Sequence, residues 1–205
     1  LAQAPLARVG GRVDDDARAF HKRLQDLVLG GIAVLLLAPL LGLIALLVKL
    51  DSPGPAFFRQ RRHGFNQEEI TVWKFRTMKQ EAADATASRQ VTKDDERVTR
   101  LGRFLRASSL DELPQLVNVL KGEMSLVGPR PHAIGMKTGH VESARLVAEY
   151  AHRHRIKPGM TGWAAIKGSR GPLHSAPDVR RRVQLDVEYV ERQSFWLDVY
   201  IMAVT

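Results

Sequence analysis

Two adjacent carboxylates, Asp111 and Glu112, stand in the stretch RASSLDELPQLVNVLKGEMSLVGPRP, which ends with Arg130 between two prolines. A carboxylate pair can hold a divalent cation together with phosphate oxygens and waters. A guanidinium that its neighbours hold in place binds phosphate through two parallel hydrogen bonds. Together these residue types favour chemistry on a phosphorylated substrate.

A structural interpretation of the same acids is also open. Ser109 and Glu112 have the spacing of a capping box, in which the Glu side chain reaches back to the main chain of the Ser. Apolar residues follow at helical spacing: Leu113, Leu116, Val117 and Leu120. We therefore expect the acids at the start of a short amphipathic helix that ends at Gly122. Pro114 fits the first turn better if the cap is Asp111, and local chemistry does not decide between a cap and a catalytic pair.

Composition limits the class of protein. A chain of 205 residues is long enough for one domain with a real core. Its 31 Lys and Arg against 22 Asp and Glu give a net charge of +9, which indicates an anionic partner. Membrane headgroups or a phosphorylated substrate fit this charge, whereas nucleic acid is not expected because no nucleic-acid-binding motif is present. The absence of cysteine excludes disulfides and thiolate metal sites.

The segment Leu27–Val48 is apolar and carries no charge. Its length suits a membrane-spanning helix, which needs about 20 apolar residues. Pro39 would kink such a helix near its middle. Cationic residues flank the segment on both sides: His21, Lys22, Arg23, Lys49, Arg59, Arg61 and Arg62. The positive-inside rule then places both ends in the cytoplasm, so a re-entrant helix broken at Pro39 and a simple span are equally supported.

Residues 1–20 have no useful apolar period and are interpreted as a linker or a loosely held helix. Since the chain begins with Leu, we expect a fragment or a processed form. After the apolar segment, residues 52–55 form a turn cluster. Residues 57–58 and 70–75 are expected as short strands of a hairpin, joined by a turn at residues 64–66. Arg61 and Arg62 are assigned to anionic headgroups.

Residues 81–99 are polar and are expected to form a short helix or a loop at the mouth of the site. Four arginines recur every three residues and would form a basic stripe on a helix: Arg97, Arg100, Arg103 and Arg106. A solvated face is the simpler interpretation of this stripe. Arg106 is its best candidate for phosphate binding because it is closest in sequence to the acids.

The C-terminal part is expected to be largely helical. Residues 141–154 are predicted as a helix, and a second helix carries an apolar stripe: Val179, Val183, Val187 and Val190. Four histidines lack the spacing of a metal site and are assigned to the surface: His132, His140, His152 and His154. Four aromatic residues would serve either as interfacial anchors or as core residues: Trp163, Phe195, Trp196 and Tyr200.

The stretch SSLDELPQLVNVLKGEMSLVGPRP resembles the signature of the bacterial monotopic phosphoglycosyl transferases. Other blocks of that family appear in order: DSPGP at 51–55, FFRQR at 57–61, WKFRTM at 73–78, KPGMTGW at 157–163 and FWLD at 195–198. The resemblance runs roughly from Lys22 to the C-terminus, and several motifs in fixed order make it specific. Members of the family penetrate one leaflet, so the resemblance favours the re-entrant helix.

The resemblance implies an α+β fold, a small membrane-surface catalytic domain with amphipathic helices, a short β-hairpin and a re-entrant N-terminal membrane helix. No large parallel sheet is expected, because long strands and helices do not alternate. We expect a tail at 1–20, the membrane helix at 21–50 and the catalytic domain at 51–205. The implied location is the bacterial inner membrane, with the catalytic domain on the cytoplasmic face. Larger members carry an accessory N-terminal region, and a homodimer is compatible with the family.

The implied activity is transfer of a sugar-1-phosphate from a UDP-sugar to undecaprenyl phosphate, with release of UMP. Asp111 would be the nucleophile that forms a covalent phosphosugar-aspartyl intermediate. Glu112, with Asp111, would bind Mg2+, and Arg130 would clamp the phosphate. By the same resemblance, further side chains are assigned to substrate binding: Arg59, Lys74, Arg76, Arg106 and, more weakly, Asp186.

The sugar is assigned from two segments, SLVGPRPHA and DVEYVERQSFWLD. They are most similar to members that transfer glucose-1-phosphate to begin an exopolysaccharide, and galactose-1-phosphate is the next alternative. The chain departs from the family at Ala165, where many relatives have Gln, and at Lys167-Gly168, where they have Asn-Gly. A catalytically degenerate, membrane-anchored scaffold is the alternative from another class.

Overall fold

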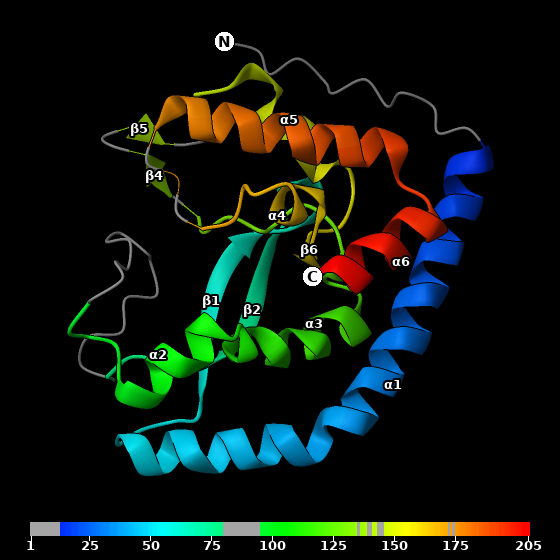
Figure 1. Cartoon of the computed structure of the whole chain (residues 1–205). Coiled ribbons are helices and arrows are strands. Elements are labelled where there is room, and N and C mark those ends of the chain that lie inside the picture. The colour runs from blue at the N-terminus through cyan, green and yellow to red at the C-terminus, as the bar shows by residue number, and fades with distance from the viewer. Residues whose placement is uncertain are drawn as a thin grey trace.

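The computed structural model describes residues 13–79, 95–134, 136–138, 141–142, 146–171, 173 and 175–205. The predictions for residues 1–12, for most of the polar segment 81–99 and for His140 lie outside this part. The structure combines helices with three two-stranded sheets, as an α+β fold requires, and no larger sheet occurs among the described residues (Figure 1).

The first element, α1, runs from Val13 to Asp51 and contains Pro39. Figure 1 shows it as two arms that meet at an angle, one along the side of the domain and one beneath it. Of the described helices, α1 alone is long and apolar enough to cross a membrane. Leu35, Leu36 and Leu50 are each about three-quarters exposed, which suggests that the helix associates with a membrane. The helix begins ahead of residue 21 and includes the end of the expected tail.

Polar contacts attach the first arm of α1 to the domain. Lys22 pairs with Asp198 at 2.6 Å, and Arg23 donates to the main-chain oxygen of Val119 at 2.6 Å. The buried carboxylate of Asp26 accepts hydrogen bonds at 3.0 Å from the hydroxyl and the amide of the segment Ser125–Leu126. Two of the basic residues expected to flank the membrane segment are therefore docking residues.

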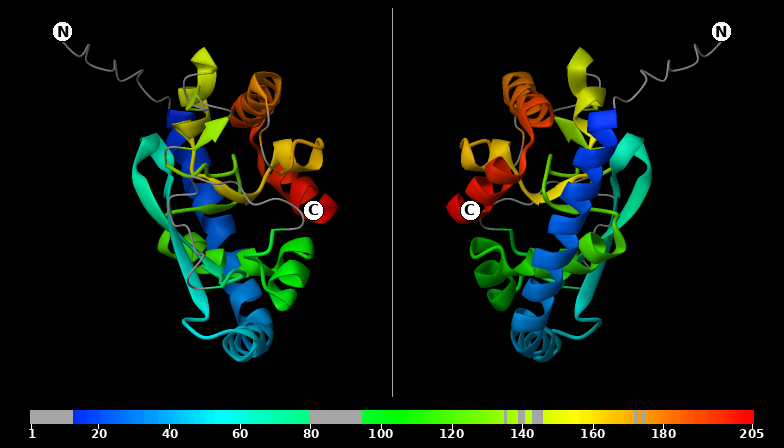
Figure 2. Two further views of the ribbon diagram at one scale, coloured as in Figure 1. Left: turned by 90° about the vertical axis from the view of Figure 1, so that its left-hand side faces the viewer. Right: turned by 90° about the vertical axis from the view of Figure 1, so that its right-hand side faces the viewer.

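The second arm of α1 packs against strand β2 (Glu69–Phe75) and helix α2 (Arg100–Ala107). Ile44 and Val48 form a buried cluster with Phe75 and Leu105. Phe75 ends strand β2, which pairs antiparallel with β1 (Phe57–His63). The short helix η1 (Phe65–Gln67) closes the turn, so the predicted hairpin is confirmed. Views from the two sides show α1 running along one side of this hairpin (Figure 2).

The acid pair lies in a short 3-10 helix, η3 (Leu110–Gln115), which leads into α3 (Leu116–Lys121). Gly122 ends α3 with a φ of 85°, as predicted. Ser109 precedes η3 with a φ of 59° and its side chain caps nothing. The capping-box interpretation is therefore wrong, and the carboxylates are available for another role. Upstream, α2 (Arg100–Ala107) is capped by Thr99.

Two glycines bring the loop of Arg130 close to the next strand. Strand β3 (Ser125–Val127) pairs in parallel with β6 (Gly159–Thr161). A Cβ at Gly159 would lie only 2.0 Å from the nitrogen of Gly128, and one at Gly128 would lie 2.5 Å from the oxygen of Lys157. Both positions therefore need glycine. The close packing of these two backbone segments fixes the direction in which the chain enters Pro129.

In Figure 1 the rest of the chain lies above the lower arm of α1, around the upper end of the hairpin. Its elements are β4 (Lys137–Thr138), β5 (Val141–Glu142), η5 (Ala148–Arg155), α4 (Trp163–Ile166), α5 (Ala176–Arg192) and α6 (Phe195–Val204). The prediction of a single helix at 141–154 is wrong, since a short strand and a 3-10 helix occupy the described residues of this range. The apolar stripe of α5 is confirmed, with Val179 and Val183 buried. Phe195, Trp196 and Tyr200 are exposed on α6 rather than packed in the core.

Candidate active site

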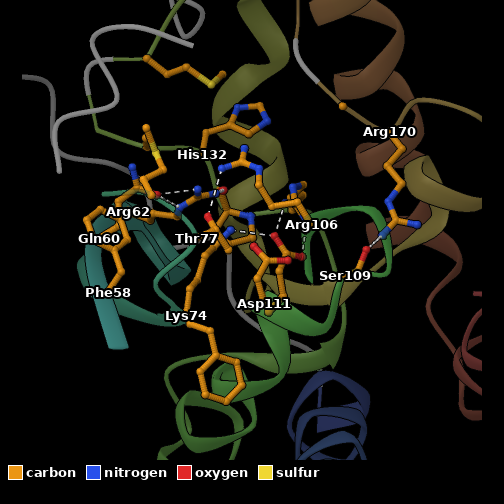
Figure 3. Close-up of a pocket in the computed structure, with 18 of the residues that line it drawn as sticks. Phe58, Gln60, Arg62, Lys74, Thr77, Arg106, Ser109, Asp111, His132 and Arg170 are labelled. Carbon is orange, nitrogen blue, oxygen red and sulfur yellow. Dashed lines mark hydrogen bonds and ion pairs between the residues drawn. The ribbon is translucent and has the colours of Figure 1, made fainter. Parts of the chain in front are cut away.

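A cavity of about 410 Å³ lies between the hairpin, η3, the loop after β3 and the segment before α5 (Figure 3). Among the described residues, eight basic side chains line it: Arg62, Lys74, Arg76, Arg97, Arg106, Arg130, Arg170 and Arg182. Asp111 and Glu112 are the carboxylates in the same lining. The surplus of positive charge favours a ligand that carries several negative charges.

Glu112 is held by two basic residues. Its Oε1 accepts from Lys74 Nζ at 2.7 Å and from Arg130 Nη2 at 2.5 Å, and its Oε2 accepts from Arg130 Nη1 at 2.9 Å. Burial alone would raise the pKa of Glu112, but the charges and hydrogen bonds of Arg130 and Lys74 outweigh burial and hold that pKa well below its usual range. Glu112 is therefore ionised at neutral pH, and its carboxylate orients both cations.

Asp111 has the opposite surroundings. It is only 8% exposed, and its carboxylate accepts no hydrogen bond and forms no ion pair with another residue of the described part. Burial raises its pKa above the usual value, although Lys74 and other nearby cations act against this rise. A desolvated carboxylate without hydrogen bonds is a better nucleophile than one that donors hold.

Two arginines approach the acids from separate elements. Arg106, near the end of α2, lines the cavity, and its nearest described partner is the hydroxyl of Thr77 at 3.4 Å. Arg170 follows α4 and donates to the hydroxyl of Ser109. In Figure 3, Lys74 and Arg170 approach Asp111 from opposite sides. Sequence reasoning selected Arg106 and missed Arg170, whose contact depends on two segments far apart in the chain.

The sequence interpretation also missed Arg62. Strand alternation places Arg62 on the same face of β1 as Gln60 and Phe58, and Phe58 is paired with Lys74. The guanidinium of Arg62 donates at 2.5 Å to the main-chain oxygen of Pro131, so Arg62 supports the loop of Arg130. Burial lowers the pKa of Arg62 to about 10, with Arg130 adding to the effect. The assignment of Arg62 to membrane headgroups is therefore wrong.

Arg59, predicted to bind substrate, does not line the cavity. It lies on the other face of β1, with its guanidinium 4.3 Å from the ring centre of Trp73. Arg76 does line the cavity, but its buried guanidinium donates to main-chain oxygens at the end of α1, including Ser52 at 2.6 Å and Val48 at 3.1 Å. These contacts fix the end of the helix, while its Nε has no hydrogen-bond partner among the described residues.

Asp186, the weakest of the predicted substrate contacts, is buried within α5. Its Oδ2 accepts from Arg153 Nε at 2.9 Å, and it does not line the large cavity. Two histidines predicted at the surface are buried as well, His132 at 4% exposure and His154 at 7%. His132 lines the cavity, whereas His152 is exposed as predicted.

The donor set of the acids fits a magnesium ion. Mg2+ takes one or two protein carboxylates and completes its shell with phosphate oxygens and waters. Asp111 has both oxygens unused by described residues, and Glu112 Oε2 accepts only one hydrogen bond. A cluster of three or more acidic or histidine side chains is absent from the described residues, so a bound ion would depend on the substrate for further ligands.

Comparison with known proteins identifies the relatives of this chain. The sequence model of the bacterial sugar transferase family matches residues 17–205. An undecaprenyl-phosphate glucose phosphotransferase of Komagataeibacter xylinus is 52% identical over 185 residues, which are 90% of this chain and 35% of the relative. An exopolysaccharide production protein of Rhizobium leguminosarum bv. phaseoli is 48% identical over 181 residues, 88% of this chain and 90% of the relative.

A more distant relative acts on a different sugar. It is a UDP-N-acetylgalactosamine-undecaprenyl-phosphate N-acetylgalactosaminephosphotransferase of Aeromonas hydrophila, 39% identical over 199 residues, 97% of this chain and 45% of the relative. The chain thus spans about a third to a half of the length of the Komagataeibacter and Aeromonas relatives.

Proposed function

Because this chain belongs to the bacterial sugar transferase family, we propose that it transfers a sugar-1-phosphate from a UDP-sugar to undecaprenyl phosphate and releases UMP. The observation that carries the proposal is the contrast between the two acids within one strongly basic cavity. Asp111 has no described partner, whereas Glu112 binds Lys74 and Arg130. The basic lining suits a diphosphate, which both the donor substrate and the lipid product contain.

In the proposed first step, an oxygen of Asp111 attacks the sugar-side phosphorus of the UDP-sugar. The bond from that phosphorus to the bridging oxygen breaks, and UMP leaves with the electron pair. A phosphosugar ester of Asp111 remains. In the second step, an oxygen of undecaprenyl phosphate attacks the same phosphorus, the bond to Asp111 breaks, and the carboxylate is restored. This order predicts ping-pong kinetics.

The cations of the cavity would bind the phosphates and stabilise charge that moves during each attack. Arg130 can present its guanidinium from a short loop between Pro129 and Pro131 while Glu112 fixes its orientation. Arg106 and Arg170, next to the acid turn, are placed to contact the same phosphates. Mg2+, held by Asp111 and Glu112, would supply charge neutralisation at the phosphate oxygens.

We assign glucose as the sugar, in the priming step of an exopolysaccharide. Support comes from relatives at 48–52% identity whose names specify glucose phosphate transfer. The alternative is another UDP-sugar of the same reaction class, such as UDP-galactose. The N-acetylgalactosamine enzyme at 39% identity shows that specificity varies within the family.

We further propose that α1 is re-entrant and that both its ends lie on the cytoplasmic face of the bacterial inner membrane. Support comes from its two attachments to one domain. Lys22 in the first arm pairs with Asp198, and Val48 in the second arm packs with Phe75 and Leu105. A straight span would carry one of these attachments across the bilayer. Both substrates would then meet at the membrane surface.

The test is UMP release from a panel of UDP-sugars with undecaprenyl phosphate and Mg2+. Asp111→Asn should abolish release, and Asp16→Asn, an exposed aspartate at the start of α1, should not. Mass spectrometry of protein quenched without the lipid acceptor should show a phosphosugar on Asp111. If folded, membrane-bound wild-type protein releases no UMP from any sugar, the transferase proposal is wrong and a scaffold role takes its place.

A further inference from the structure

Arg153 is a buried arginine that connects two helices to the loop of Arg130. Its side chain is 1% exposed. Nε donates to Oδ2 of Asp186 at 2.9 Å, and Nη2 forms an ion pair with the same oxygen at 2.7 Å. Nη1 lies 2.7 Å from Nδ1 of His132, and Nη2 donates at 2.7 Å to the main-chain oxygen of Arg130. One guanidinium thus joins η5, α5 and the loop after β3.

Stability alone does not account for this arrangement. A buried ion pair costs much of its Coulomb energy in desolvation, and an apolar pair of the same size is often as stable. An apolar pair, however, could not hold both the main chain at Arg130 and the ring of His132. Arg130 is the residue whose guanidinium lies on Glu112 beside Asp111.

The contact between Arg153 and His132 also defines the protonation of the histidine. Nδ1 of His132 also lies 2.6 Å from the hydroxyl of Tyr150, which can donate or accept. Arginine only donates hydrogen bonds, so its contact makes Nδ1 the acceptor and places the proton of the neutral ring on Nε2. Burial and the nearby charge of Arg153 lower the pKa of His132 well below its usual range, which keeps the ring neutral. Its Nε2 is buried without a hydrogen-bond partner in the described structure, although the residue lines the cavity. Buried donors without a partner are rare in native proteins, and a role at a functional site is one explanation for them.

We propose that Arg153, anchored by Asp186, is a positioning residue of the active site. It fixes the segment from Arg130 to His132 from behind, so that the guanidinium of Arg130 stays on Glu112 and the imidazole keeps its Nε2–H tautomer. The kinetic part of this inference rests on the proposed transferase activity. The tautomer does not depend on that activity and can be measured without substrate.

The first test is kinetic. Arg153→Lys keeps the positive charge but cannot make the contacts of a planar fork. A displacement of about 1 Å at the reacting groups can cost about 100-fold in rate. We therefore expect kcat to fall about 10- to 100-fold, with KM for the UDP-sugar changing less than about 3-fold. Arg155→Lys is the matched control, because Arg155 is an exposed arginine of the same helix η5.

A double-mutant cycle separates positioning from general damage. If Arg153 acts through Arg130, adding Arg153→Lys to Arg130→Lys should cost less than about 3-fold beyond Arg130→Lys alone. Multiplicative losses would overturn the proposal, as would equal kcat values for Arg153→Lys and Arg155→Lys. If Arg153→Lys does not fold, Asp186→Asn replaces it in the cycle, with Glu191→Gln as the exposed control on α5.

The second test measures His132 by 15N NMR of the imidazole. All proteins compared carry Tyr150→Phe, because the Tyr150 hydroxyl could otherwise donate to Nδ1 and hold the same tautomer. The parent protein should show a neutral ring with its proton on Nε2, and adding Arg153→Lys should lose this fixed tautomer. Arg155→Lys should keep it. An unchanged tautomer in Arg153→Lys would overturn the inference even if the enzyme is active. If wild-type protein releases no UMP, the transferase proposal fails while this measurement still decides the role of Arg153.

Discussion

The ammonium of Lys74 lies 2.7 Å from Oε1 of Glu112 and forms no ion pair with the adjacent acid Asp111. Arg130 also pairs with Glu112 and not with Asp111. Two consecutive carboxylates therefore have separate roles. Glu112 orients the cations, and Asp111 is the desolvated carboxylate that attacks phosphorus in the proposed reaction.

The charge of Lys74 should affect the pH dependence of kcat/KM through the pKa of Asp111. Asp111 must be ionised to attack, and burial raises its pKa, so kcat/KM should fall on the acid side at a higher pH than an ordinary aspartate would give. Lys74 acts against this rise. Lys74→Met should therefore move the acid limb of the profile of kcat/KM to still higher pH. Lys121→Met, a surface control on α3, should leave it in place, and an unmoved limb in Lys74→Met would rule out Asp111 as the ionising group.

Glu112→Gln should destabilise the fold, because two cations near it lose their counter-charge. Removing one partner of a largely buried pair costs about 2–4 kcal/mol, whereas Glu149→Gln at an exposed position should cost little. The measurement is unfolding followed by circular dichroism as a function of pH.

The pH window of this difference follows from the pKa of Glu112, which folding lowers. The unfolded state then binds the proton more tightly, so the stabilisation is full above the ordinary value of 4.5. It is lost progressively as pH falls from there through the folded pKa. A gap between wild type and Glu112→Gln that stays constant into strong acid would contradict the ion-pair assignment.

Much of the site could be predicted from the sequence where one motif carries it. The acids, the proline-flanked Arg130 and the stop at Gly122 lie in a single stretch, and the hairpin follows from its turn. Strand alternation could also have separated Arg62 from Arg59, since Phe58 pairs with Lys74 and every second residue of β1 shares its face.

Other parts could not be read from the sequence, because they depend on contacts between distant segments. Arg170 meets Ser109 across 61 positions of the chain. In the sequence, Arg153 cannot be distinguished from an exposed arginine of a polar helix. Its buried position depends on Asp186, which lies on α5. The predicted helix at 141–154 failed for a related reason: buried partners for Tyr150 and Arg153 outweigh local helix propensity there.

Arg106 should contribute to substrate binding rather than to stability. Its nearest described partner, Thr77, is 3.4 Å away, so its loss leaves no strong contact unmade. A charge-assisted hydrogen bond to phosphate contributes about 1.5–3 kcal/mol, so Arg106→Gln should raise KM for the UDP-sugar about 10-fold or more. Arg103→Gln, at an exposed position of the same helix α2, is the control. Equal KM values for the two variants would remove Arg106 from the site.

The last prediction concerns the two ends of α1, which should lie on the same side of the membrane. The chain has no cysteine, so single cysteines at Arg18 and Ser52 can be labelled without further changes. A membrane-impermeant maleimide should label both positions in inverted vesicles and neither in spheroplasts.

Pro39 removes a main-chain hydrogen bond within the apolar segment and favours the bend there. Pro39→Ala should therefore expose Arg18→Cys to label in some spheroplast molecules, whereas Ala38→Gly should not. These straightened molecules should also lose activity, since the pair Lys22–Asp198 cannot form across a bilayer. Labelling of the two positions from opposite sides in otherwise wild-type protein would show that α1 spans the membrane.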